Sequence, residues 1–168
     1  PGLGTILVGK DPASITYVAG KHKDCAEVGI NSIKIELAEN SSEAQILQAV
    51  AQLNENESCT GFIVQLPLPN GVSAQRVLEA VKPEKDADGL HPINLGRLIL
   101  NQNGIKPCTP LAIIELAKAN GISWDGKEVV IIGRGTTVGR PLSMLLTNKA
   151  LNSTVTVVHT GTKNIGEV

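Results

Sequence analysis

The sequence predicts an α/β fold with a mostly parallel sheet, and three observations support this prediction. Short β-branched runs alternate with segments of helical periodicity along all 168 residues. Helix caps, glycines and prolines mark the connections between these segments. Towards the end of the chain, residues 128–146 contain a buried strand, a glycine-rich turn and a helix, an order that is typical of dinucleotide-binding folds.

The glycine-rich turn has the spacing Gly-x-Gly-x-x-x-Gly, with its glycines at Gly133, Gly135 and Gly139. This spacing is one residue longer than the usual fingerprint. The β-branched run 129–132 suits a strand buried on both faces, and Pro141 suits the start of the helix that follows. Backbone N–H groups in such a turn favour an anion, so we expect a cofactor phosphate here. The alternative is an ordinary tight turn between a strand and a helix.

Composition limits the classes of function. The net charge is −1 and no basic patch stands out, so we expect no nucleic-acid partner. No apolar run approaches the length of a membrane span, and no signal peptide is visible, so we expect no membrane partner. The cysteines Cys25, Cys59 and Cys108 are odd in number and lack metal-ligand spacing, which favours reduced thiols in the cytoplasm and no metal site.

Both ends of the chain suggest a longer protein. The sequence opens at Pro1 without Met and enters a predicted strand almost at once, and it stops at Val168 soon after the second strand of the dinucleotide unit. A mononucleotide-binding half normally needs three strands. We therefore expect the chain to be truncated at both ends.

The first elements follow from caps and periodicity. Residues 4–8 are rich in β-branched side chains, which predicts a strand. Asp11 suits the N-cap of a helix over residues 12–28, and Gly29 suits its closing residue. Residues 32–37 alternate between apolar and polar side chains, which predicts the next strand.

A second helix and a third strand come next. Asn40 and Glu43 have the spacing of a capping box, and an apolar stripe after them continues to Leu53. Residues 61–64 predict a short buried strand that ends at the polar Gln65. The prolines after Gln65 cannot continue a central strand.

The remaining segments complete the alternation of strands and helices. Ser73 suits the cap of a helix that continues to Val81, and residues 84–92 form a polar loop. A further helix over residues 109–119 and a strand over residues 154–158 follow.

A boundary between two lobes falls most naturally where Pro107 and Pro110 flank Cys108 and Thr109. We therefore expect residues 1–108 to form an N-terminal α/β lobe. Residues 109–168 are expected to form a Rossmann-like dinucleotide-binding lobe that is incomplete at its C-terminal side.

Candidate site residues follow from the position of ligands in open α/β sheets, beyond the carboxyl ends of the strands. Gln65, Asp88 and the helix carrying Tyr17 and Lys21 could lie at or near that edge. Alternatives remain open for each. Gln65 could be a solvated strand end, Asp86 and Asp88 could belong to a solvated turn, and Tyr17 with Lys21 could be an ordinary amphipathic pair.

The second strand of the dinucleotide unit indicates which cofactor is used. An acidic residue at its end would bind the ribose 2′-hydroxyl of NAD, but the segment after Val158 contains no carboxylate next to the strand. The segment reads His159-Thr160-Gly161-Thr162-Lys163, and Arg134 in the glycine turn, with donors at Thr160, Thr162 and Lys163, suits a 2′-phosphate and therefore NADP. The alternative for Arg134 is a solvent-facing loop arginine.

Five short motifs, in order, resemble the bifunctional methylenetetrahydrofolate dehydrogenase/methenyltetrahydrofolate cyclohydrolase family. They cover nearly the whole chain, and although each is modest alone, the ordered set is specific. The motifs are Pro12-Ala13-Ser14-x-x-Tyr17-Val18-x-x-Lys21, Val64-Gln65-Leu66-Pro67-Leu68-Pro69, Lys85-Asp86-Ala87-Asp88-Gly89, Pro107-Cys108-Thr109-Pro110 and Gly133-Arg134-x-x-x-Val138-Gly139-Arg140-Pro141.

The resemblance implies that the first lobe binds folate and that two reactions occur in one cleft. NADP⁺ takes a hydride from 5,10-methylenetetrahydrofolate, and water then opens the 5,10-methenyl product to 10-formyltetrahydrofolate. By this similarity Lys21 is the key catalytic residue of the hydrolytic step, and Tyr17 stacks against the folate ring system. Gln65 would hydrogen-bond Lys21, and Asp88 would hold the pterin nitrogens through charge-assisted bonds.

The same resemblance implies the rest of the binding residues. Ser14, Leu66 and Pro67 would line the substrate pocket. The cofactor would contact a set drawn from the glycine turn and the loop after the second strand: Gly133, Arg134, Gly135, Gly139, His159, Thr160 and Thr162.

The resemblance also implies a cytoplasmic homodimer formed through the cofactor lobe, acting in one-carbon metabolism that supplies purine biosynthesis. Gly135 departs from the family, which commonly has Ser after the turn arginine, so one hydroxyl donor is missing. The family also continues past Val168 with segments that hold the nicotinamide. Two alternatives remain: a non-catalytic nucleotide-binding module, or a family member that retains only one of the two activities.

Overall fold

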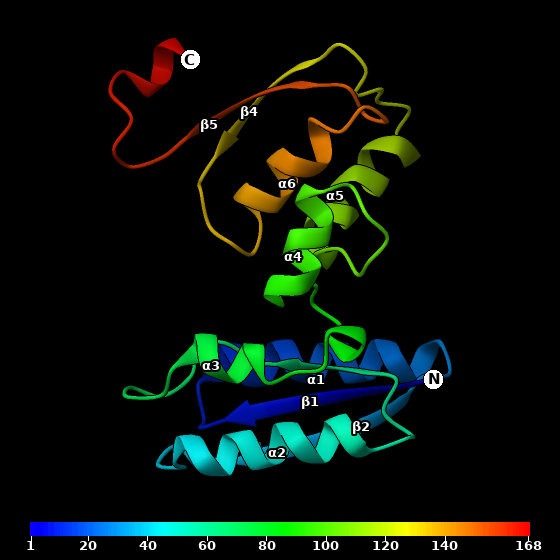
Figure 1. Cartoon of the computed structure of the whole chain (residues 1–168), viewed down its shortest axis with the longest axis vertical. Coiled ribbons are helices and arrows are strands. Elements are labelled where there is room, and N and C mark those ends of the chain that lie inside the picture. Colours follow the sequence, from blue (N-terminus) through cyan, green and yellow to red (C-terminus); the bar gives the residue numbers. More distant parts are fainter. The chain divides into compact units, whose positions relative to one another are not determined.

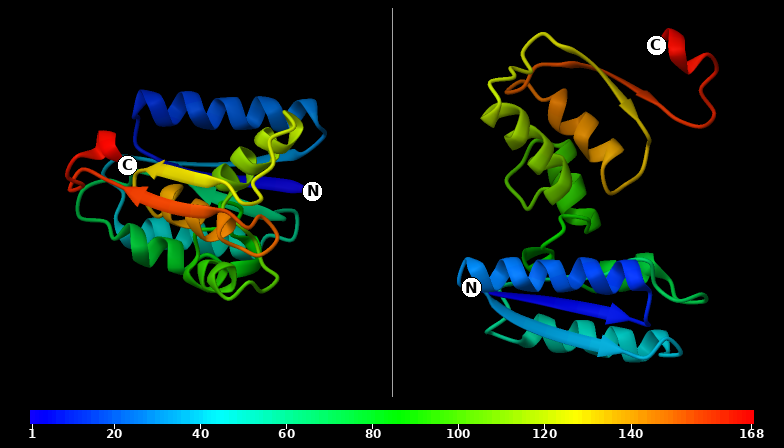
Figure 2. Two further views of the ribbon diagram at one scale, coloured as in Figure 1. Left: turned by 90° about the horizontal axis from the view of Figure 1, so that it is seen from above. Right: turned by 180° about the vertical axis from the view of Figure 1, so that it is seen from behind.

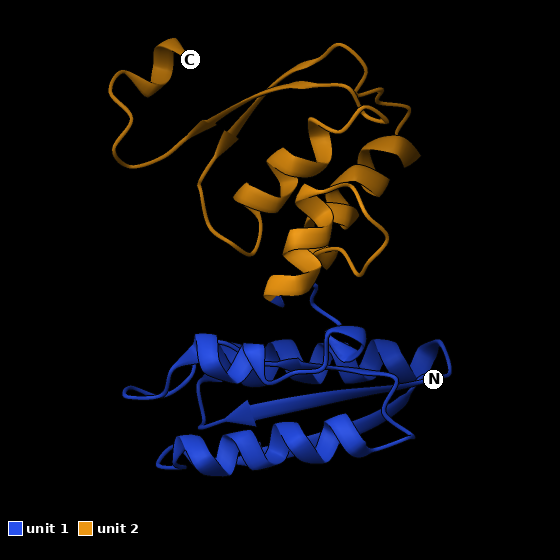
Figure 3. Cartoon of the chain, viewed as in Figure 1, with its two compact units in different colours: residues 1–91 blue, residues 92–168 orange.

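The computed structural model describes all 168 residues, Pro1–Val168. The chain divides into two compact units, Pro1–His91 and Pro92–Val168 (Figure 3). Both units combine helices with parallel strands, so the predicted α/β class is confirmed. No helix is both long enough and apolar enough to span a membrane.

The first unit contains a parallel sheet with the strand order β2-β1-β3 (Figure 1). Its elements are β1 (Gly2–Val8), α1 (Pro12–Glu27), β2 (Asn31–Leu37), α2 (Glu43–Glu55), β3 (Gly61–Val64), α3 (Ala74–Glu79) and the 3-10 turn η1 (Pro83–Lys85). All three strands run in one direction, so their carboxyl ends lie at one edge, as a ligand site in such a sheet requires.

Helices α1 and α2 lie on opposite sides of the strands in this unit (Figure 2). Alternate residues of β1 therefore meet different helices. Ile6 and Val8 join Leu53 of α2 and Phe62 of β3 in an aliphatic core. Thr5 is turned towards α1, where it contacts His22. The scarcity of aromatic residues agrees with a core in which Phe62 is the one buried ring among aliphatic side chains.

The contact between β1 and α1 is polar. His22 is 6% exposed, and its Nε2 lies 2.8 Å from Oγ1 of Thr5. Its Nδ1 is buried without a hydrogen-bond partner. Burial lowers the pKa of His22, and the positive charge of Lys34 lowers it further. The folded protein therefore holds this imidazole neutral.

His22 is expected to make the stability of the protein depend on pH. In the unfolded chain a histidine has an ordinary pKa of about 6.5. Below that pH the unfolded state therefore binds a proton at His22 that the folded state does not bind. Above this pH the titration of His22 should not change the free energy of unfolding. Below it, this free energy should fall by up to about 1.4 kcal/mol per pH unit, until the lowered folded pKa is reached. His22→Gln, which keeps a group able to bond Thr5, should remove most of this slope.

Urea unfolding at pH 7.5 and 5.5 measures the effect in both proteins. Because His91 and His159 are retained in the variant, their titration is common to both and cancels in the comparison. Equal losses of stability between the two pH values in the native protein and in His22→Gln would contradict the assignment.

Most expected helix starts are confirmed, but one cap was assigned to the wrong residues. Asp11 caps α1 and Gly29 follows it with φ of 73°, as predicted. The capping box of α2 is formed by Ser42 and Gln45, not by Asn40 and Glu43. The Glu43 carboxylate instead accepts a bond from the backbone N–H of Ser73, at 2.8 Å. The polar residues before α2 include several that could cap it, so the sequence alone did not show at which residue the helix starts. The contact of Glu43 with Ser73 favours the cap formed by Ser42 and Gln45.

The predicted polar loop 84–92 is more structured than expected. It begins in η1, and Pro92 opens a helix, α4 (Pro92–Ile99), that the sequence analysis did not predict. Helix α3 ends at Glu79, short of the predicted Val81. Val81 is nevertheless buried in the core of the unit.

The second unit contains a parallel pair of strands, β4 and β5 (Figure 1). Its elements are α4, α5 (Cys108–Ala119), β4 (Glu128–Ile132), α6 (Gly139–Leu146), β5 (Thr154–Val158) and the 3-10 turn η2 (Ile165–Glu167). Helix α6 packs on both strands, and α4 and α5 pack on α6. Because α4 packs there, the compact units divide after His91, whereas the sequence-based boundary falls after residue 108.

The strands of the second unit have one covered face and one open face. Ile131 is buried against α6 in a core that includes Leu142 and Leu146. Its neighbours Val130 and Ile132 are exposed, Ile132 by 79%. The expectation that this run is buried on both faces is therefore wrong for these strands, because helices cover only one side of the pair.

Candidate functional site

Tyr17 and Lys21 occupy one face of α1, as their spacing predicts. The Nζ of Lys21 lies 4.3 Å from the centroid of the Tyr17 ring, a cation–π contact. Tyr17 is 58% exposed. The ring therefore holds the ammonium group while much of its own surface remains open to a planar ligand. A hollow of about 650 Å³ runs along this face and is lined by Pro12, Ala13, Thr16, Tyr17, Gly20, Lys21 and Asp24.

A local cap holds the start of α1. The Asp11 carboxylate accepts a 2.8 Å bond from the backbone N–H of Ser14. It also accepts a bond from the Ser14 hydroxyl, and these two bonds lower the pKa of Asp11. Ser14 is buried. Its hydroxyl is thus engaged in capping the helix, which is its role in this structure, while its contact with a substrate stays a prediction.

Asp88 stands in the loop between η1 and α4, close enough to Lys21 for their charges to interact. Burial raises the pKa of the Asp88 carboxyl, the charge of Lys21 opposes this effect, and that of Asp86 adds to it. The structure therefore brings the candidate pair Lys21 and Asp88 together from segments far apart in the sequence.

Asp86 holds the loop that carries Asp88. Its backbone forms a parallel bridge with Phe62 of β3, and the N–H of Ala87 donates to the Phe62 carbonyl at 3.2 Å. The buried Asp86 carboxylate accepts a 2.8 Å bond from the backbone N–H of His91. The alternative of a solvated turn is therefore wrong for Asp86. No signal in the sequence distinguished it from Asp88.

Gln65 lies at the end of β3, where the sequence placed it. Its backbone N–H donates to the Ile6 carbonyl at 2.9 Å and extends the ladder by one bond. Its side-chain amide donates to the carbonyl of Leu66 at 2.9 Å. The Leu66–Pro67 peptide bond is cis. The amide is thus engaged with its own loop, and the ammonium of Lys21 lies over Tyr17 instead of on Gln65.

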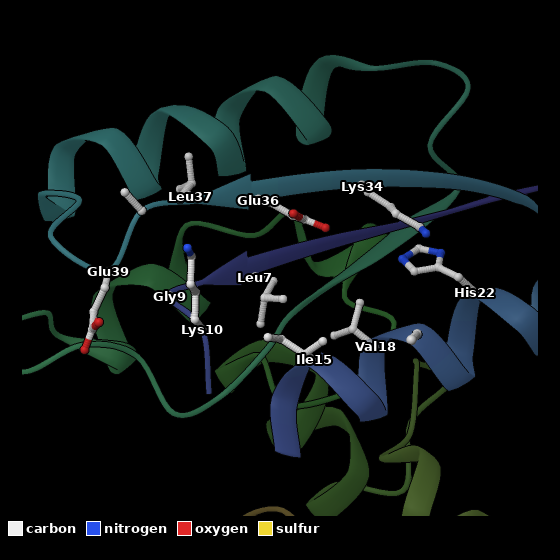
Figure 4. Close-up of a pocket in the computed structure, with 12 residues that line it drawn as sticks. Leu7, Gly9, Lys10, Ile15, Val18, His22, Lys34, Glu36, Leu37 and Glu39 are labelled. Atoms are coloured by element: carbon white, nitrogen blue, oxygen red, sulfur yellow. The ribbon is translucent and has the colours of Figure 1, made fainter. Parts of the chain in front are cut away.

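A separate cavity of about 650 Å³ lies on the other face of α1, against β1 and β2 (Figure 4). Leu7, Ile15 and Val18 make much of its wall apolar. His22 and Lys34 lie at one end, and Lys10 and Glu39 lie towards the other (Figure 4). None of the residues predicted to bind substrate lines it.

The glycine turn of the second unit brings its two ends into very close contact. The N–H of Gly133 donates to the Val158 carbonyl at 2.8 Å, so the turn starts level with the end of β5. Gly133 has φ of 124°, which only glycine adopts readily. A Cβ on Gly139 would lie 2.1 Å from the Gly133 carbonyl oxygen. A Cβ on Gly135 would meet nothing closer than the Thr137 hydroxyl at 3.9 Å.

The loop after β5 completes the candidate cofactor site. The N–H of His159 donates to Oγ1 of Thr162 at 2.9 Å, and the N–H of Gly161 donates to Nδ1 of His159 at 3.0 Å. The Nη1 of Arg134 lies 3.1 Å from Nε2 of the same ring. A hollow of about 460 Å³ is lined by Ile132, Gly133, Arg134, His159, Thr160 and Ile165, and it contains no carboxylate.

These residues fit the phosphate-bearing part of a dinucleotide. The absence of a Cβ at Gly139 lets the Gly133 carbonyl pack closely against it and keeps the turn tight, and the hollow at the turn offers donors without an acid. The structure thus places Gly133, Arg134, His159 and Thr160 around one hollow. No group of His, Cys, Asp and Glu side chains is arranged to hold a metal ion.

The fold and both candidate sites define a two-unit α/β protein whose second unit is of the dinucleotide-binding type. Two family descriptions match the chain: the catalytic domain of tetrahydrofolate dehydrogenase/cyclohydrolase over residues 1–88, and the NAD(P)-binding domain of the same family over residues 107–168. The chain therefore belongs to the tetrahydrofolate dehydrogenase/cyclohydrolase family, and the predicted resemblance is confirmed.

Individual relatives agree with this assignment. "Bifunctional protein FolD 1" of Nocardioides sp. is 56% identical over 165 residues, which are 98% of this chain and 56% of that protein. The crystal structure of the bifunctional enzyme FolD from Campylobacter jejuni superposes with a TM-score of 0.93 at 44% identity, covering 97% of this chain and 57% of the other. Thus the chain spans little more than half the length of the relatives it matches.

A third relative is described with a bound cofactor. The methylenetetrahydrofolate dehydrogenase-cyclohydrolase of Trypanosoma brucei, crystallised with NADP and an inhibitor, superposes with a TM-score of 0.91 at 43% identity. The match covers 96% of this chain and 55% of that one.

Proposed function

We propose that the protein carrying this chain oxidises 5,10-methylenetetrahydrofolate to the 5,10-methenyl form with NADP⁺ and hydrolyses that product to 10-formyltetrahydrofolate. The observation that carries the proposal is the grouping of Tyr17, Lys21 and Asp88 on one surface of the first unit. A folate combines a flat, nitrogen-rich ring with reactive one-carbon chemistry, and this group offers an aromatic face, an amine and a carboxyl.

Tyr17 and Asp88 bind and orient the substrate in this proposal. The exposed ring of Tyr17 stacks on the pterin, and the Asp88 carboxyl bonds its amino and ring nitrogens. Burial raises the pKa of the Asp88 carboxyl and so favours its protonated form more than in an exposed carboxyl. Orientation alone brings the reacting carbon into position for hydride transfer, for which NADP⁺, when bound, supplies the acceptor.

Lys21 moves protons in the hydrolytic step. Attack of water on the methenyl carbon and opening of the ring require a proton to leave the water and a proton to reach the departing nitrogen. An amine within reach of both can carry it. The Tyr17 ring and the Asp88 carboxyl lie beside Lys21 and hold its amine in this position. Gln65 and the Leu66–Pro67 turn are assigned to the wall of the same pocket, with Ser14 at its base.

The cofactor proposal rests on the donors in the second unit. Gly133, Gly135 and Gly139 bring the backbone close to the pyrophosphate, and Arg134, His159, Thr160 and Thr162 surround the adenine ribose. The hollow beside Arg134 lacks the acid that would bind the 2′-hydroxyl of NAD, which supports NADP.

Arg134→Ala is expected to remove the preference for NADP over NAD. A charge-assisted bond to the 2′-phosphate would be lost, at a cost of about 1.5–3 kcal/mol in NADP binding, while NAD binding should change little. Dissociation constants for both cofactors, measured by calorimetry, give the ratio directly. Lys149→Ala, which removes an exposed positive charge beyond the far end of α6, serves as the matched control. Equal affinity for the two cofactors in the native protein would contradict the assignment.

One observation favours the narrower alternative of a protein with only one of the two activities. The Gln65 amide bonds Leu66 rather than Lys21, so the interaction that would tune Lys21 for hydrolysis is not formed. Separate assays decide this: formation of NADPH from 5,10-methylenetetrahydrofolate reports oxidation, and loss of methenyl absorbance reports hydrolysis. Both activities support the proposal, one supports the alternative, and neither points to a non-catalytic nucleotide-binding module.

The assembly and setting are proposed from the family. A homodimer through the cofactor unit is implied by the family resemblance. Sedimentation of the protein carrying this chain tests this assembly. A cytoplasmic role in one-carbon metabolism that feeds purine biosynthesis is consistent with the reduced cysteines Cys25, Cys59 and Cys108.

A further inference from the structure

Five positions of the chain carry Asn or Asp directly before a glycine, the pattern in which the backbone can attack the preceding side chain. Glycine permits this attack because it has no Cβ to obstruct the approach of its amide nitrogen to the side-chain carbon. The sequence treats the five pairs alike, so the fold decides which of them can react. The pairs are Asn70-Gly71, Asp88-Gly89, Asn103-Gly104, Asn120-Gly121 and Asp125-Gly126.

In three of these pairs the attacking nitrogen is already engaged in a hydrogen bond. At Asn120 the side chain is engaged as well, because its amide nitrogen donates to the Leu116 carbonyl at 2.8 Å. An attack at these positions must first break the existing bonds. The N–H groups of Gly89, Gly121 and Gly126 donate to the carbonyls of Asp86, Lys118 and Asn152 at 3.2, 3.0 and 3.0 Å.

The pair Asn70-Gly71 has both reacting groups free. It lies in the loop between β3 and α3, and both residues are exposed. The turn is closed by one bond, from the N–H of Val72 to the Pro69 carbonyl at 3.2 Å, which uses neither the Gly71 N–H nor the Asn70 side chain. Gly71 has φ of 87°, and a Cβ on it would meet nothing within 4 Å. The backbone therefore has room to move towards the side chain.

The pair Asn103-Gly104 differs from Asn70-Gly71 in its packing. Its groups make no hydrogen bond, but Gly104 lies against α4. A Cβ on Gly104 would lie 2.9 Å from Cδ and 3.3 Å from Cβ of Arg97. Rotation of this backbone towards the Asn103 side chain is therefore obstructed, and Asn70 is the asparagine with both free groups and open space.

We propose that Asn70 is a site of spontaneous deamidation, to which the fold directs the reaction in preference to the other Asn-Gly pairs. The Gly71 nitrogen attacks Cγ of Asn70, a C–N bond forms, and the bond from Cγ to the side-chain nitrogen breaks. The proton of the Gly71 N–H leaves with that nitrogen as ammonia. Water then opens the cyclic imide at either carbonyl and gives aspartate or isoaspartate. No oxidant or cofactor takes part, so this inference does not depend on the proposed function.

The products change the loop in two ways. Both carry a carboxylate where the native residue is neutral. Isoaspartate also adds a methylene group to the main chain between Pro69 and Val72, so the bond that closes the turn cannot keep its geometry. Deamidation at Asn70 therefore alters the charge and the length of the loop that begins at Gln65.

Peptide mapping by mass spectrometry, after incubation of the protein carrying this chain at pH 8, measures conversion at each Asn-Gly pair. In the folded protein Asn70 is expected to convert fastest. It should convert at least about tenfold faster than Asn120, where two hydrogen bonds must break first. In urea that unfolds the protein these bonds are absent, and Asn70 and Asn120 should convert at similar rates. The comparison separates the effect of the fold from that of the sequence.

Asn70→Gln is the matched variant, because its longer side chain would have to close a larger ring that forms more slowly. Conversion at this position should be lost, and Asn103 and Asn120 should convert as in the native protein. An unmodified Asn70 in the folded protein overturns the proposal, as does conversion of Asn103 or Asn120 at the same rate or faster. An equal ratio of the Asn70 and Asn120 rates with and without urea overturns the role of the fold. Turnover of folate or cofactor does not enter these measurements, so a failure of the proposed function leaves this inference intact.

Discussion

Lys21→Met is expected to reduce hydrolysis of 5,10-methenyltetrahydrofolate by about 10²–10⁴-fold in the protein carrying this chain, and to leave oxidation of the methylene substrate measurable. Methionine keeps the length and apolar stem of the lysine but removes the amine to which we assign proton transfer. Hydride transfer depends mainly on positioning, the role proposed for Tyr17 and Asp88, which the variant retains. Absorbance of the methenyl compound follows the first activity, and absorbance of NADPH follows the second.

Lys23→Met is the matched control for this experiment. Lys23 lies on the same helix but on its exposed side, where its ammonium makes a 3.8 Å ion pair with Glu27. The control substitution should change neither activity. Native rates of methenyl hydrolysis in Lys21→Met would show that the catalytic assignment is wrong. Gln65→Ala should lower hydrolysis less than Lys21→Met does. The amide of Gln65 bonds Leu66, so its loss should change only the shape of the pocket.

Gly139→Ala is expected to abolish dinucleotide binding. The added methyl group would lie 2.1 Å from the carbonyl oxygen of Gly133 and 2.8 Å from its carbonyl carbon, distances that no side-chain movement can relieve. The glycine turn must therefore open, which moves its N–H groups away from the pyrophosphate. Such a disruption of well-packed backbone should also lower the free energy of unfolding, by about 1–3 kcal/mol.

Gly135→Ala provides the control within the same turn. Its methyl group would have the Thr137 hydroxyl as its nearest neighbour, at 3.9 Å, and its backbone is not in the left-handed region. Stability should be retained, and NADP affinity should change far less than in Gly139→Ala. Calorimetric titration with NADP and thermal unfolding of both variants give the comparison. Similar NADP affinities in the two variants would exclude the close approach at Gly139 as a requirement for binding.

The strands were predictable because their signal is local. Three β-branched or alternating runs in the first unit and two in the second lie where the periodicity put them. Helix α4 was missed because its eight residues follow a polar loop directly, although Pro92 at its first position and its apolar stripe, which packs on α6, are local signals that could have predicted it. The cap of α2 was misplaced because the contact of Glu43 with Ser73 joins residues far apart in the chain.

The candidate site was predictable in part. The spacing of Tyr17 and Lys21 alone predicts their contact, because residues four apart share a helix face. Their proximity to Asp88 depends on how the loop is held to β3 through Asp86, a buried carboxylate that resembled a solvated one in the sequence. The hydrogen bond from Gln65 to Leu66 depends on the backbone path of the loop after β3. The prolines in this loop limit that path but do not determine it, so the sequence did not predict the bond.

Two adjacent residues of helix α1 differ in their surroundings, Lys21 in the candidate site and His22 against the sheet. The rotation of α1 about its own axis therefore determines where the Lys21 ammonium group lies. The ammonium group of Lys21 lies over the Tyr17 ring, and the next residue, His22, is buried and contacts Thr5. With side chains reaching about 5–6 Å from the axis, a roll of about 10° would displace the ammonium group by roughly 1 Å. A misplacement of that size in a catalytic group can cost about 10²-fold in rate. The contact of His22 with the Thr5 hydroxyl on the central strand thus helps to fix the rotation of α1 and with it the position of the Lys21 ammonium group.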